Sequence, residues 1–386
     1  MGHVFVIFSA YYPPHIGGVE IFTQRLAHTL SKRGASVIVV TNDADALGAG
    51  VADDGKVKVL RLPCHPLLDA RFPVAKNDSR ARGLWHWLES QDIGGVLVNT
   101  RFYPLSIAGM RFARKKGLKP VVLDHGSAYL SFGSHALDPL VRSYEHMITA
   151  RGKCYEPAYY GISKKSVEWL SEFGITAEGV IPNSIDAAVY RATSSGRDFR
   201  AELSLDDARL MVAFVGRFVP EKGVASLLEA SRSDRLAKAG VVFVMAGGGV
   251  LATEVEAAQG ETLRWVGKLS APDVSALFQQ ADLLCLPTRS EGFSTTLLEA
   301  AACGCPAVIT DVGGAHELIP DETYGTILPS MSAEDVEAAI YGLSARRDVI
   351  ACQSIACQRL VEKSCSWDAT AAVVEEAFRK ASGPVT

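Results

Sequence analysis

The sequence predicts two doubly wound α/β domains, each built around a parallel β-sheet. Short runs rich in β-branched residues alternate with helical stretches over almost the whole chain, which is the pattern of parallel sheets with crossover helices. The runs are continuously apolar, as expected for strands covered on both faces. The chain has 386 residues, too many for one ordinary domain and enough for two.

Six apolar runs form the first series of strands. They cover residues 4–8, 36–41, 57–62, 95–99, 120–125 and 159–163. Between the first two, Phe22, Leu26, Ala27 and Leu30 share one face of a helix that is expected to end near Gly34.

A second series of six strands follows residue 209. Its runs are 210–216, 241–246, 263–267, 281–287, 306–311 and 325–329, and helices are expected near 223–231, 250–258, 272–280, 294–302 and 332–344. We therefore expect an N-terminal domain over 1–185 and a C-terminal domain over 186–366. A helix in the last segment, 367–386, is expected to return to the first domain.

Composition limits the classes of function. The net charge of −4 gives no general attraction to nucleic acid. No apolar run reaches the roughly 18–20 residues that span a bilayer, and the apolar start reads as a first strand. The eight cysteines are scattered, and Cys285, Cys303 and Cys305 lie in apolar surroundings typical of reduced, packed thiols. These features predict a cytoplasmic protein.

Ligands of open α/β sheets bind beyond the carboxyl ends of strands, so the segments after the strands are the candidate sites. After the first strand, Gly17 and Gly18 open a helix, where bare backbone N–H groups can approach an anion. A plain turn between strand and helix explains the pair equally well. The spaced G-x-G-x-x-G of dinucleotide folds is absent, which argues against an NAD-binding protein.

A second candidate segment, 215–223, carries Arg217 and Lys222 around a proline-containing turn. A planar guanidinium and a mobile ammonium together suit a diphosphate. The alternative is a solvated surface turn in which Glu221 pairs with one of the two cations.

A third candidate segment, 287–299, joins a strand to a helix. Ser294 and Thr295 are natural residues for a helix start, where free N–H groups can hold phosphate. A capping box formed by Thr296 and Glu299 is the structural alternative. Glu291 has no capping role and is the sharper functional candidate.

Two further polar sites follow strands of the first half. His125 ends a strand beside Gly126, a position where either a structural or a catalytic histidine fits. Asp43 and Asp45 form a D-x-D pattern that we interpret as a polar loop rather than a metal site, so no metal is expected.

In order and spacing, these segments resemble retaining glycosyltransferases of the GT-B fold, specifically glycosyltransferase family 4. Glu291 and Glu299 match the E-x7-E motif of that family, and 215–223 matches its donor-phosphate motif. Segment 182–186 is similar to its P-N-G-V-D sequence with Ser184 in place of glycine, and 246–249 resembles its G-x-G turn. The resemblance covers nearly the whole chain.

The resemblance implies a role for each candidate residue. The donor diphosphate would be bound by Arg217, Lys222, Gly17, Gly18, Ser294 and Thr295. The sugar and ribose would be bound by Glu291, Gly292, Phe293 and Glu299. His125 and Glu291 would be catalytic, with His125 facing the sugar from the first domain.

The resemblance also implies the chemistry. A hexose would move from GDP-mannose or a UDP-sugar with retention, through an oxocarbenium-like transition state. Fixed cations and helix N-termini would stabilise the leaving diphosphate without a cofactor or obligatory metal. Either the departing phosphate takes the acceptor proton, or a short-lived covalent intermediate forms.

The acceptor is expected to be a glycan or a lipid-linked molecule in cell-surface polysaccharide synthesis, because 125–163 resembles bacterial transferases of that kind. Two basic clusters beside aromatic residues suggest contact with an anionic membrane on its inner face, although solvated helix faces explain them as well. The clusters are Arg71, Lys76, Arg80 and Arg82, and Arg111, Arg114, Lys115, Lys116 and Lys119.

Two alternatives remain at this point. A non-hydrolysing nucleotide-sugar epimerase has the same fold and would need no acceptor. A non-catalytic nucleotide-sugar-binding protein is the other, although the intact glutamates and cations favour catalysis.

Overall fold

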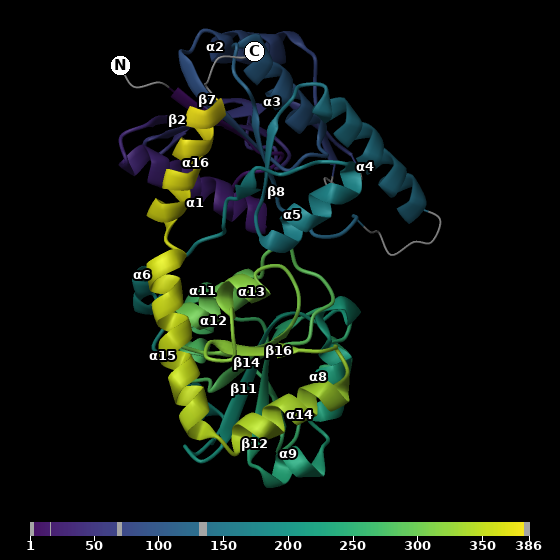
Figure 1. Ribbon diagram of the computed structural model, residues 1–386, viewed down its shortest axis with the longest axis vertical. Helices are drawn as coiled ribbons and strands as arrows, with labels where there is room; N and C mark the ends of the chain where they lie inside the picture. Colours follow the sequence, from purple (N-terminus) through teal and green to yellow (C-terminus); the bar gives the residue numbers. More distant parts are fainter. Residues whose placement is uncertain (1–3, 16, 68–71, 131–136, 382–386) are drawn as a thin grey trace. The chain divides into compact units, whose positions relative to one another are not determined.

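The computed structural model describes residues 4–15, 17–67, 72–130 and 137–381, so Arg71 lies outside the described residues. The chain divides into two compact units (Figure 1). The N-terminal unit comprises Met1–Asn183 with Trp367–Thr386, and the C-terminal unit comprises Ser184–Ser366.

The N-terminal unit is built on a sheet with the strand order β10-β9-β8-β7-β1-β2-β4-β3. Its parallel strands are β1 (Val4–Phe8), β2 (Ser36–Asn42), β4 (Val57–Leu62), β7 (Ile93–Asn99), β8 (Val121–Asp124), β9 (Ala158–Gly161) and β10 (Gly179–Val180). The six expected strands of this half are confirmed. The order reverses between β1 and β7, which makes their carboxyl ends the natural ligand site.

Three features of this unit escaped the sequence pattern. β3 (Gly50–Asp54) pairs antiparallel with β4 at the sheet edge, and β5 (Cys64–Leu67) and β6 (Phe72–Ala75) form a separate two-stranded sheet. β3 and β5 are largely exposed, so their residues form no continuous apolar run. The short strand β10 was also missed.

Helices cover the sheet of the N-terminal unit. They are α1 (Gly18–Lys32), α2 (Ser79–Glu89), α3 (Pro104–Lys115), α4 (Asp138–Lys153), α5 (Lys164–Leu170) with the 3-10 turn η1 (Ser171–Phe173), and α16 (Trp367–Ala381). The expected apolar face of α1 is buried: Phe22, Leu26, Ala27 and Leu30 are at most 2% exposed.

Helix α16, the last helix of the chain, packs against α1 and β7 of the N-terminal unit (Figure 1). The Phe378 ring lies 4.7 Å from the ring of Phe5. A Cβ at Gly95 would lie 2.6 Å from the Phe378 ring, so only glycine leaves room for it on β7.

The C-terminal unit contains a parallel sheet with the order β13-β12-β11-β14-β15-β16. The strands are β11 (Leu210–Arg217), β12 (Val241–Gly248), β13 (Leu263–Trp265), β14 (Leu283–Leu286), β15 (Ala307–Thr310) and β16 (Gly325–Leu328), and they confirm the six expected runs. The strand order reverses between β11 and β14. This is the doubly wound arrangement whose ligands bind at the reversal point.

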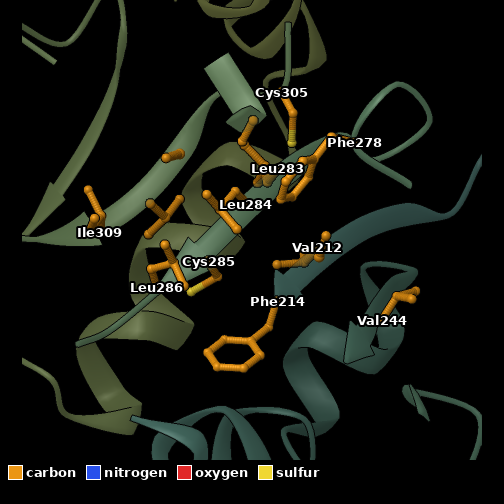
Figure 2. Close-up of a cluster of buried hydrophobic side chains, with 14 of the residues drawn as sticks. Val212, Phe214, Val244, Phe278, Leu283, Leu284, Cys285, Leu286, Cys305 and Ile309 are labelled. Carbon is orange, nitrogen blue, oxygen red and sulfur yellow. The ribbon is translucent and has the colours of Figure 1, made fainter. Parts of the chain in front are cut away.

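Figure 2 shows part of the core of this unit, in which Val212 and Phe214 of β11 lie near residues of β14. Cys285 and Cys305 are fully buried among these apolar side chains and pack as small hydrophobes, as expected. The covering helices are α6 (Ala187–Ala192), α7 (Phe199–Glu202), α8 (Val224–Ala230) after the 3-10 turn η2 (Pro220–Lys222), α9 (Asp234–Lys238), α10 (Ala252–Ala257), α11 (Ala271–Phe278), α12 (Thr295–Ala302), α13 (Ala315–Leu318), α14 (Ala333–Ser344) and α15 (Arg347–Ser364).

Within the described ranges, no helix has both the length and the apolar character needed to cross a bilayer.

Candidate active site

In the C-terminal unit, the loops that follow β11 and β14 are joined by hydrogen bonds at the reversal point of the sheet. The carbonyl of Glu221 accepts from the backbone N–H of Arg289 at 2.8 Å and from Oγ1 of Thr288 at 3.1 Å. Gly223 adopts a φ of 68°, and a Cβ there would lie 2.0 Å from the carbonyl oxygen of Pro287. Because the two backbones meet so closely, only glycine fits this position.

These joined loops bring Lys222 and Glu291 into contact, although they lie 69 residues apart in sequence. Nζ of Lys222 forms an ion pair with Oε1 of Glu291, and each side chain is about one-fifth exposed. The alternative, a surface turn in which Glu221 pairs with Arg217 or Lys222, is wrong, because neither cation pairs with Glu221 in the described residues. Arg217 is exposed at the end of β11, and the described part of the chain gives its guanidinium no partner.

Helix α12 begins at Thr295, and the Ser294 side chain caps it by accepting a hydrogen bond from Leu297 N at 3.3 Å. The earlier helix start is confirmed, and the capping box with Thr296 as its first residue is wrong. The Ser294 hydroxyl is 2% exposed and already engaged, whereas Thr295 is exposed. The first turn also leaves backbone N–H groups without partners in its own helix.

A third loop, between β15 and α13, supports the segment around Glu291. Gly313 donates to the Glu291 carbonyl at 3.1 Å and accepts from Ser294 N at 3.2 Å. A Cβ at Gly313 would lie 2.1 Å from the Gly292 carbonyl oxygen. The Phe293 ring covers Gly314, where a Cβ would be 3.3 Å away. This support was not foreseen in the sequence.

Glu299 lies one turn into α12 and is half-buried. Burial raises the pKa of its carboxyl group to about 7. Burial, and then the charge of Glu299, raise the pKa of Tyr190, whose hydroxyl is buried without a hydrogen-bond partner in the described residues. Glu299 thus places carboxyl oxygens in a poorly hydrated position on the helix that directly follows the Glu291 loop.

The segment 246–249, expected to be a turn, forms the last residues of β12 and the residue after it, and packs backbone against backbone on the end of β11. A Cβ at Gly247 would lie 1.9 Å from the Gly216 carbonyl oxygen, and one at Gly249 would lie 2.6 Å from that of Phe218. Glycine at these positions keeps the loop after β11 close to the sheet end, so the expected phosphate segment is anchored on both sides.

In the N-terminal unit, a pocket of about 220 Å³ lies where the strand order reverses between β1 and β7. Residues following β1, β7 and β8, together with the first turn of α1, form its wall. They are Ser9, Ala10, Tyr11, Val19, Glu20, Thr100, Arg101, Phe102, Tyr103, His125, Gly126, Ala128 and Leu130.

His125 is held in this wall by a buried chain of hydrogen bonds. Its Nε2 lies 3.0 Å from Oδ1 of Asn99, and Nδ2 of Asn99 donates to Oγ1 of Thr23 at 2.7 Å. The Phe22 ring meets the imidazole edge-on at 5.1 Å. Burial lowers the pKa of His125 to about 3, so the ring is neutral near pH 7.

The same chain determines which nitrogen of His125 carries the proton. The Thr23 hydroxyl donates to the carbonyl of Val19 at 2.7 Å, so it can only accept from the amide of Asn99. The Asn99 oxygen therefore faces His125, and Nε2 must be the donor. Nδ1 is left as a hydrogen-bond acceptor, with no partner in the described chain.

Glu20 folds back over the start of α1. It is 8% exposed, and a Cβ at Gly17 would lie 2.1 Å from its Oε2. Burial raises the pKa of its carboxyl group. The carboxyl thus occupies the end of α1 where an anion was expected beside Gly17 and Gly18, and their role in diphosphate binding stays a prediction.

Arg101 is buried beneath the pocket in an ionic cluster. Nη1 lies 3.2 Å from Oδ1 of Asp124, Nη2 lies 2.8 Å from Oε2 of Glu145, and each side chain is at most 1% exposed. The guanidinium also lies 3.9 Å from the centre of the Phe173 ring. Burial raises the pKa of Asp124 to about 6, against the opposing effect of Arg101.

Asp43 has partners within its own loop, and Asp45 has a partner in the loop after β1. The Asp43 carboxylate accepts from Leu47 N at 2.8 Å and Gly48 N at 3.1 Å, and Oδ1 of Asp45 lies 3.2 Å from Nδ1 of His15. The described residues contain no cluster of three or more metal-ligating side chains.

Glu20, Thr100, Arg101 and Tyr103 are pocket residues that sequence reasoning missed. For Thr100, Arg101 and Tyr103 the available signal was their position immediately after the apolar run 95–99, at a strand end in the first half, whereas Glu20 lies in the candidate segment after the first strand. Thr100 has a φ of 64°, rare for a β-branched residue and typical of functional loops.

Comparison with protein families matches two models to this chain. "Glycosyltransferase Family 4" matches residues 16–189, and "Glycosyl transferases group 1" matches residues 196–354. The fold and these matches define the class: the chain belongs to glycosyltransferase family 4 and has the GT-B fold.

Among the relatives of this chain, a D-inositol 3-phosphate glycosyltransferase of Segniliparus rotundus is 30% identical over 52% of this chain, a match that spans about half of that relative (46%). An uncharacterized glycosyltransferase of Methanocaldococcus jannaschii is 24% identical over 88% of both chains. The predicted family is thereby confirmed.

Solved structures share the fold over the whole chain. Sucrose-phosphate synthase from Thermosynechococcus elongatus has a TM-score of 0.75 at 18% identity, with 98% of each chain covered. Anabaena HepE in complex with UDP-glucose has a TM-score of 0.68 at 16% identity, covering 98% of this chain and 99% of that one.

Proposed function

We propose that this protein transfers a hexose, with retention, from a nucleoside diphosphate sugar to a glycan or lipid-linked acceptor during assembly of a cell-surface glycan. The observation that carries the proposal is the contact of Lys222 with Glu291 at the reversal point of the C-terminal sheet, beside α12 and Glu299. The cation and the helix start match the diphosphate of a donor, Glu291 matches its sugar, and Glu299 matches its ribose.

In this proposal the leaving diphosphate is stabilised by Arg217, Lys222 and the first turn of α12. Arg217 is exposed and has no partner in the described residues, so it can turn to a ligand without breaking an ion pair. Lys222 exchanges Glu291 for a phosphate oxygen. Cations and helix N-termini placed in advance can stabilise the charge that develops on the diphosphate without a metal ion.

The sugar and ribose lie next to this phosphate site. Glu291, with the backbone of Gly292 and Phe293, contacts the transferred sugar, and Glu299 accepts hydrogen bonds from the ribose hydroxyls. The rigid attachment of the Glu291 loop to Gly313 supports this role, because positioning of the reacting sugar requires a fixed loop.

On the acceptor side, neutral His125 orients a hydroxyl by accepting a hydrogen bond at Nδ1. A pKa of about 3 makes the ring a weak base, which favours proton transfer to the departing phosphate.

A thermal-shift panel of UDP-, GDP- and ADP-sugars tests the donor assignment, with UDP-glucose and GDP-mannose as the first probes. The cognate donor is expected to stabilise the folded state by about 2.7 kcal/mol at a concentration 100 times its dissociation constant. Arg217→Ala and Lys222→Ala should each weaken binding by about 1.5–3 kcal/mol, because each removes a charged partner of the diphosphate.

Arg232→Ala is the matched control, because this exposed arginine follows the opposite end of α8 from Lys222. It should leave donor affinity unchanged. The proposal fails if no nucleotide sugar raises the melting temperature. An isomerised donor formed without acceptor would instead identify an epimerase.

We also propose that the protein acts at the inner face of the membrane, through a groove of about 530 Å³ between α2, α3 and β6. Trp85 and Phe112 form an apolar part of the groove wall. Lys76 and Arg111, one from each basic cluster, also line the groove, and their side chains have no partners in the described residues. An apolar groove with a basic rim suits anionic headgroups.

Most of the second basic cluster is already engaged, which restricts the membrane proposal to Lys76 and Arg111. Arg114, Lys115 and Lys119 pair with glutamates, and Lys116 donates to backbone carbonyls. In liposome flotation, Lys76→Glu with Arg111→Glu should abolish binding to vesicles that contain anionic lipid. Equal flotation of the protein and this double variant, or none for either, would end the membrane proposal.

A further inference from the structure

The pocket of the N-terminal unit has a chemical character that restricts what it can receive. Its wall combines aromatic rings, hydrogen-bond acceptors and one buried cation that is already paired. The donor site proposed above uses none of these groups.

We propose that this pocket receives an uncharged, hydroxyl-rich ring, a sugar or cyclitol with no phosphate at the end that enters, as the acceptor of the transfer. The inference rests on the proposed function, because only a transferase needs the hydroxyl of a second substrate.

Aromatic rings provide the apolar part of the wall. Tyr103 lies edge-on to Tyr11 at 5.8 Å and tilted against Phe102 at 4.7 Å. The C–H faces of a sugar or cyclitol ring are apolar and pack on such rings, while the hydroxyl groups at the ring edge remain available for hydrogen bonds.

Two groups of the wall, His125 and Glu20, present hydrogen-bond acceptors in addition to the hydroxyl groups of its serine, threonine and tyrosine residues. Nδ1 of His125 has a lone pair and no proton, as the Asn99–Thr23 chain requires. Glu20 adds carboxyl oxygens at the start of α1. Hydroxyl groups donate to such acceptors, whereas an ionised phosphate has no proton to give.

The charges in the wall of the pocket disfavour a phosphate more strongly than its hydrogen-bonding groups do. Glu20 and Arg101 are the charged residues in the described wall, and the guanidinium of Arg101 is bound by both Asp124 and Glu145. An entering phosphate would therefore meet a carboxyl group and no available cation. Burial of an unpaired anion is costly, so a neutral polyol is the better occupant.

Two buried polar atoms in the same wall still lack partners within the described residues. They are Oγ1 of Thr100 and Nε of Arg101. Thr100 is 5% exposed and has a backbone conformation rare for threonine. Unsatisfied groups of this kind are uncommon in folded proteins, and because both atoms are buried they lie behind the wall rather than on its open surface.

This chemistry departs from the acceptor that the names of several relatives indicate. These relatives are D-inositol 3-phosphate glycosyltransferases, and their matches cover between 47% and 95% of this chain. The residues of this pocket argue that a phosphorylated cyclitol is not the acceptor group that enters it here.

The test compares neutral and phosphorylated probes as pairs. Saturation-transfer NMR on the full chain, in the presence of the donor nucleotide, measures the binding of myo-inositol against inositol 3-phosphate and of methyl glucoside against glucose 6-phosphate. At least one neutral probe should bind, and its phosphorylated partner should bind at least about tenfold more weakly.

Variants of Glu20 then test the cause. Glu20→Gln preserves the size of the side chain and should narrow the difference in affinity between a neutral probe and its phosphorylated partner. Glu20→Lys should shift the ratio of the two affinities toward the phosphorylated probe by about tenfold or more. Glu89→Gln is the control, because Glu89 lies in the separate groove beside α2. This exchange should leave the affinity for every probe unchanged.

Tighter binding of a phosphorylated probe to the unaltered protein would overturn the inference, as would the failure of all four probes to bind. An unchanged preference in the folded Glu20→Gln variant would also overturn it. In each case a persisting thermal shift by a nucleotide sugar leaves the proposed function intact, whereas loss of that shift counts against the proposed function itself.

Discussion

Replacement of Glu291 by glutamine is expected to reduce sugar transfer by roughly 10²–10³-fold while leaving nucleotide affinity unchanged or higher. The size of the loss is that of a group which stabilises charge in the transition state. Nucleotide binding should not fall, because the exchange frees Lys222 from its ion pair and lets it turn fully to the diphosphate. Initial transfer rates and calorimetric titration with the nucleoside diphosphate measure the two effects separately.

Glu221→Gln is the matched control for this experiment. It removes a carboxylate from the neighbouring loop, but Glu221 is exposed and holds the site through its backbone carbonyl. Transfer and affinity should both stay near their original values. An equal loss of transfer and nucleotide affinity in Glu291→Gln would show that Glu291 serves binding alone.

Replacement of Arg101 by methionine is expected to destabilise the N-terminal unit by about 3–5 kcal/mol, because it leaves the carboxylates of Asp124 and Glu145 buried without their cation. Four of the five tryptophans belong to this unit, so denaturant unfolding followed by tryptophan fluorescence reports mainly on it. The C-terminal unit can unfold in a separate transition, which then serves as an internal reference.

The loss in free energy of unfolding caused by Arg101→Met should grow as pH rises from about 5 to about 8. Burial raises the pKa of Asp124 to about 6, above its value in the unfolded chain, so protonation favours the folded state at low pH. Without Arg101 the protonated carboxyl group of Asp124 can still be accommodated at low pH, whereas at high pH its carboxylate is buried without a cation. A loss of stability that is constant across this pH range would contradict the role given to the buried carboxyl group of Asp124.

Arg114→Met is the control for burial. Arg114 forms an ion pair with Glu156 at 2.8 Å, but the Glu156 side chain is 72% exposed. An exposed pair contributes at most about 1 kcal/mol, so this exchange should change the free energy of unfolding little. A similar loss in both variants would show that burial is not the cause.

The sequence was informative wherever a strand is covered on both faces. β14 and β15 are buried at every residue, and their apolar runs predicted them directly. β3 was missed because its middle residues are exposed and it pairs at an edge. The start of α12 was predictable because the spacing of Leu297 and Leu298 favours Ser294 as the cap.

The site was predictable only in part, because much of it depends on contacts between distant segments. Motif and spacing pointed to Lys222 and Glu291, but their ion pair joins loops that only the folded sheet brings together. The position of Glu20 over Gly17 depends on the missing side chain of glycine, which no periodicity reveals. The tautomer of His125 likewise follows from hydrogen bonds of Thr23, far away in sequence.

The packing of α16 on β7 has a consequence for how the protein matures during synthesis. Phe378, which lies against Phe5 and Gly95, is made after all of Ser184–Ser366. The half whose synthesis begins first therefore waits for its final helix, while the inserted half leaves the ribosome as an uninterrupted stretch and can fold earlier. A nascent chain stopped before Trp367 would contain a finished C-terminal unit and an N-terminal unit with an uncovered apolar face, to which chaperones can bind.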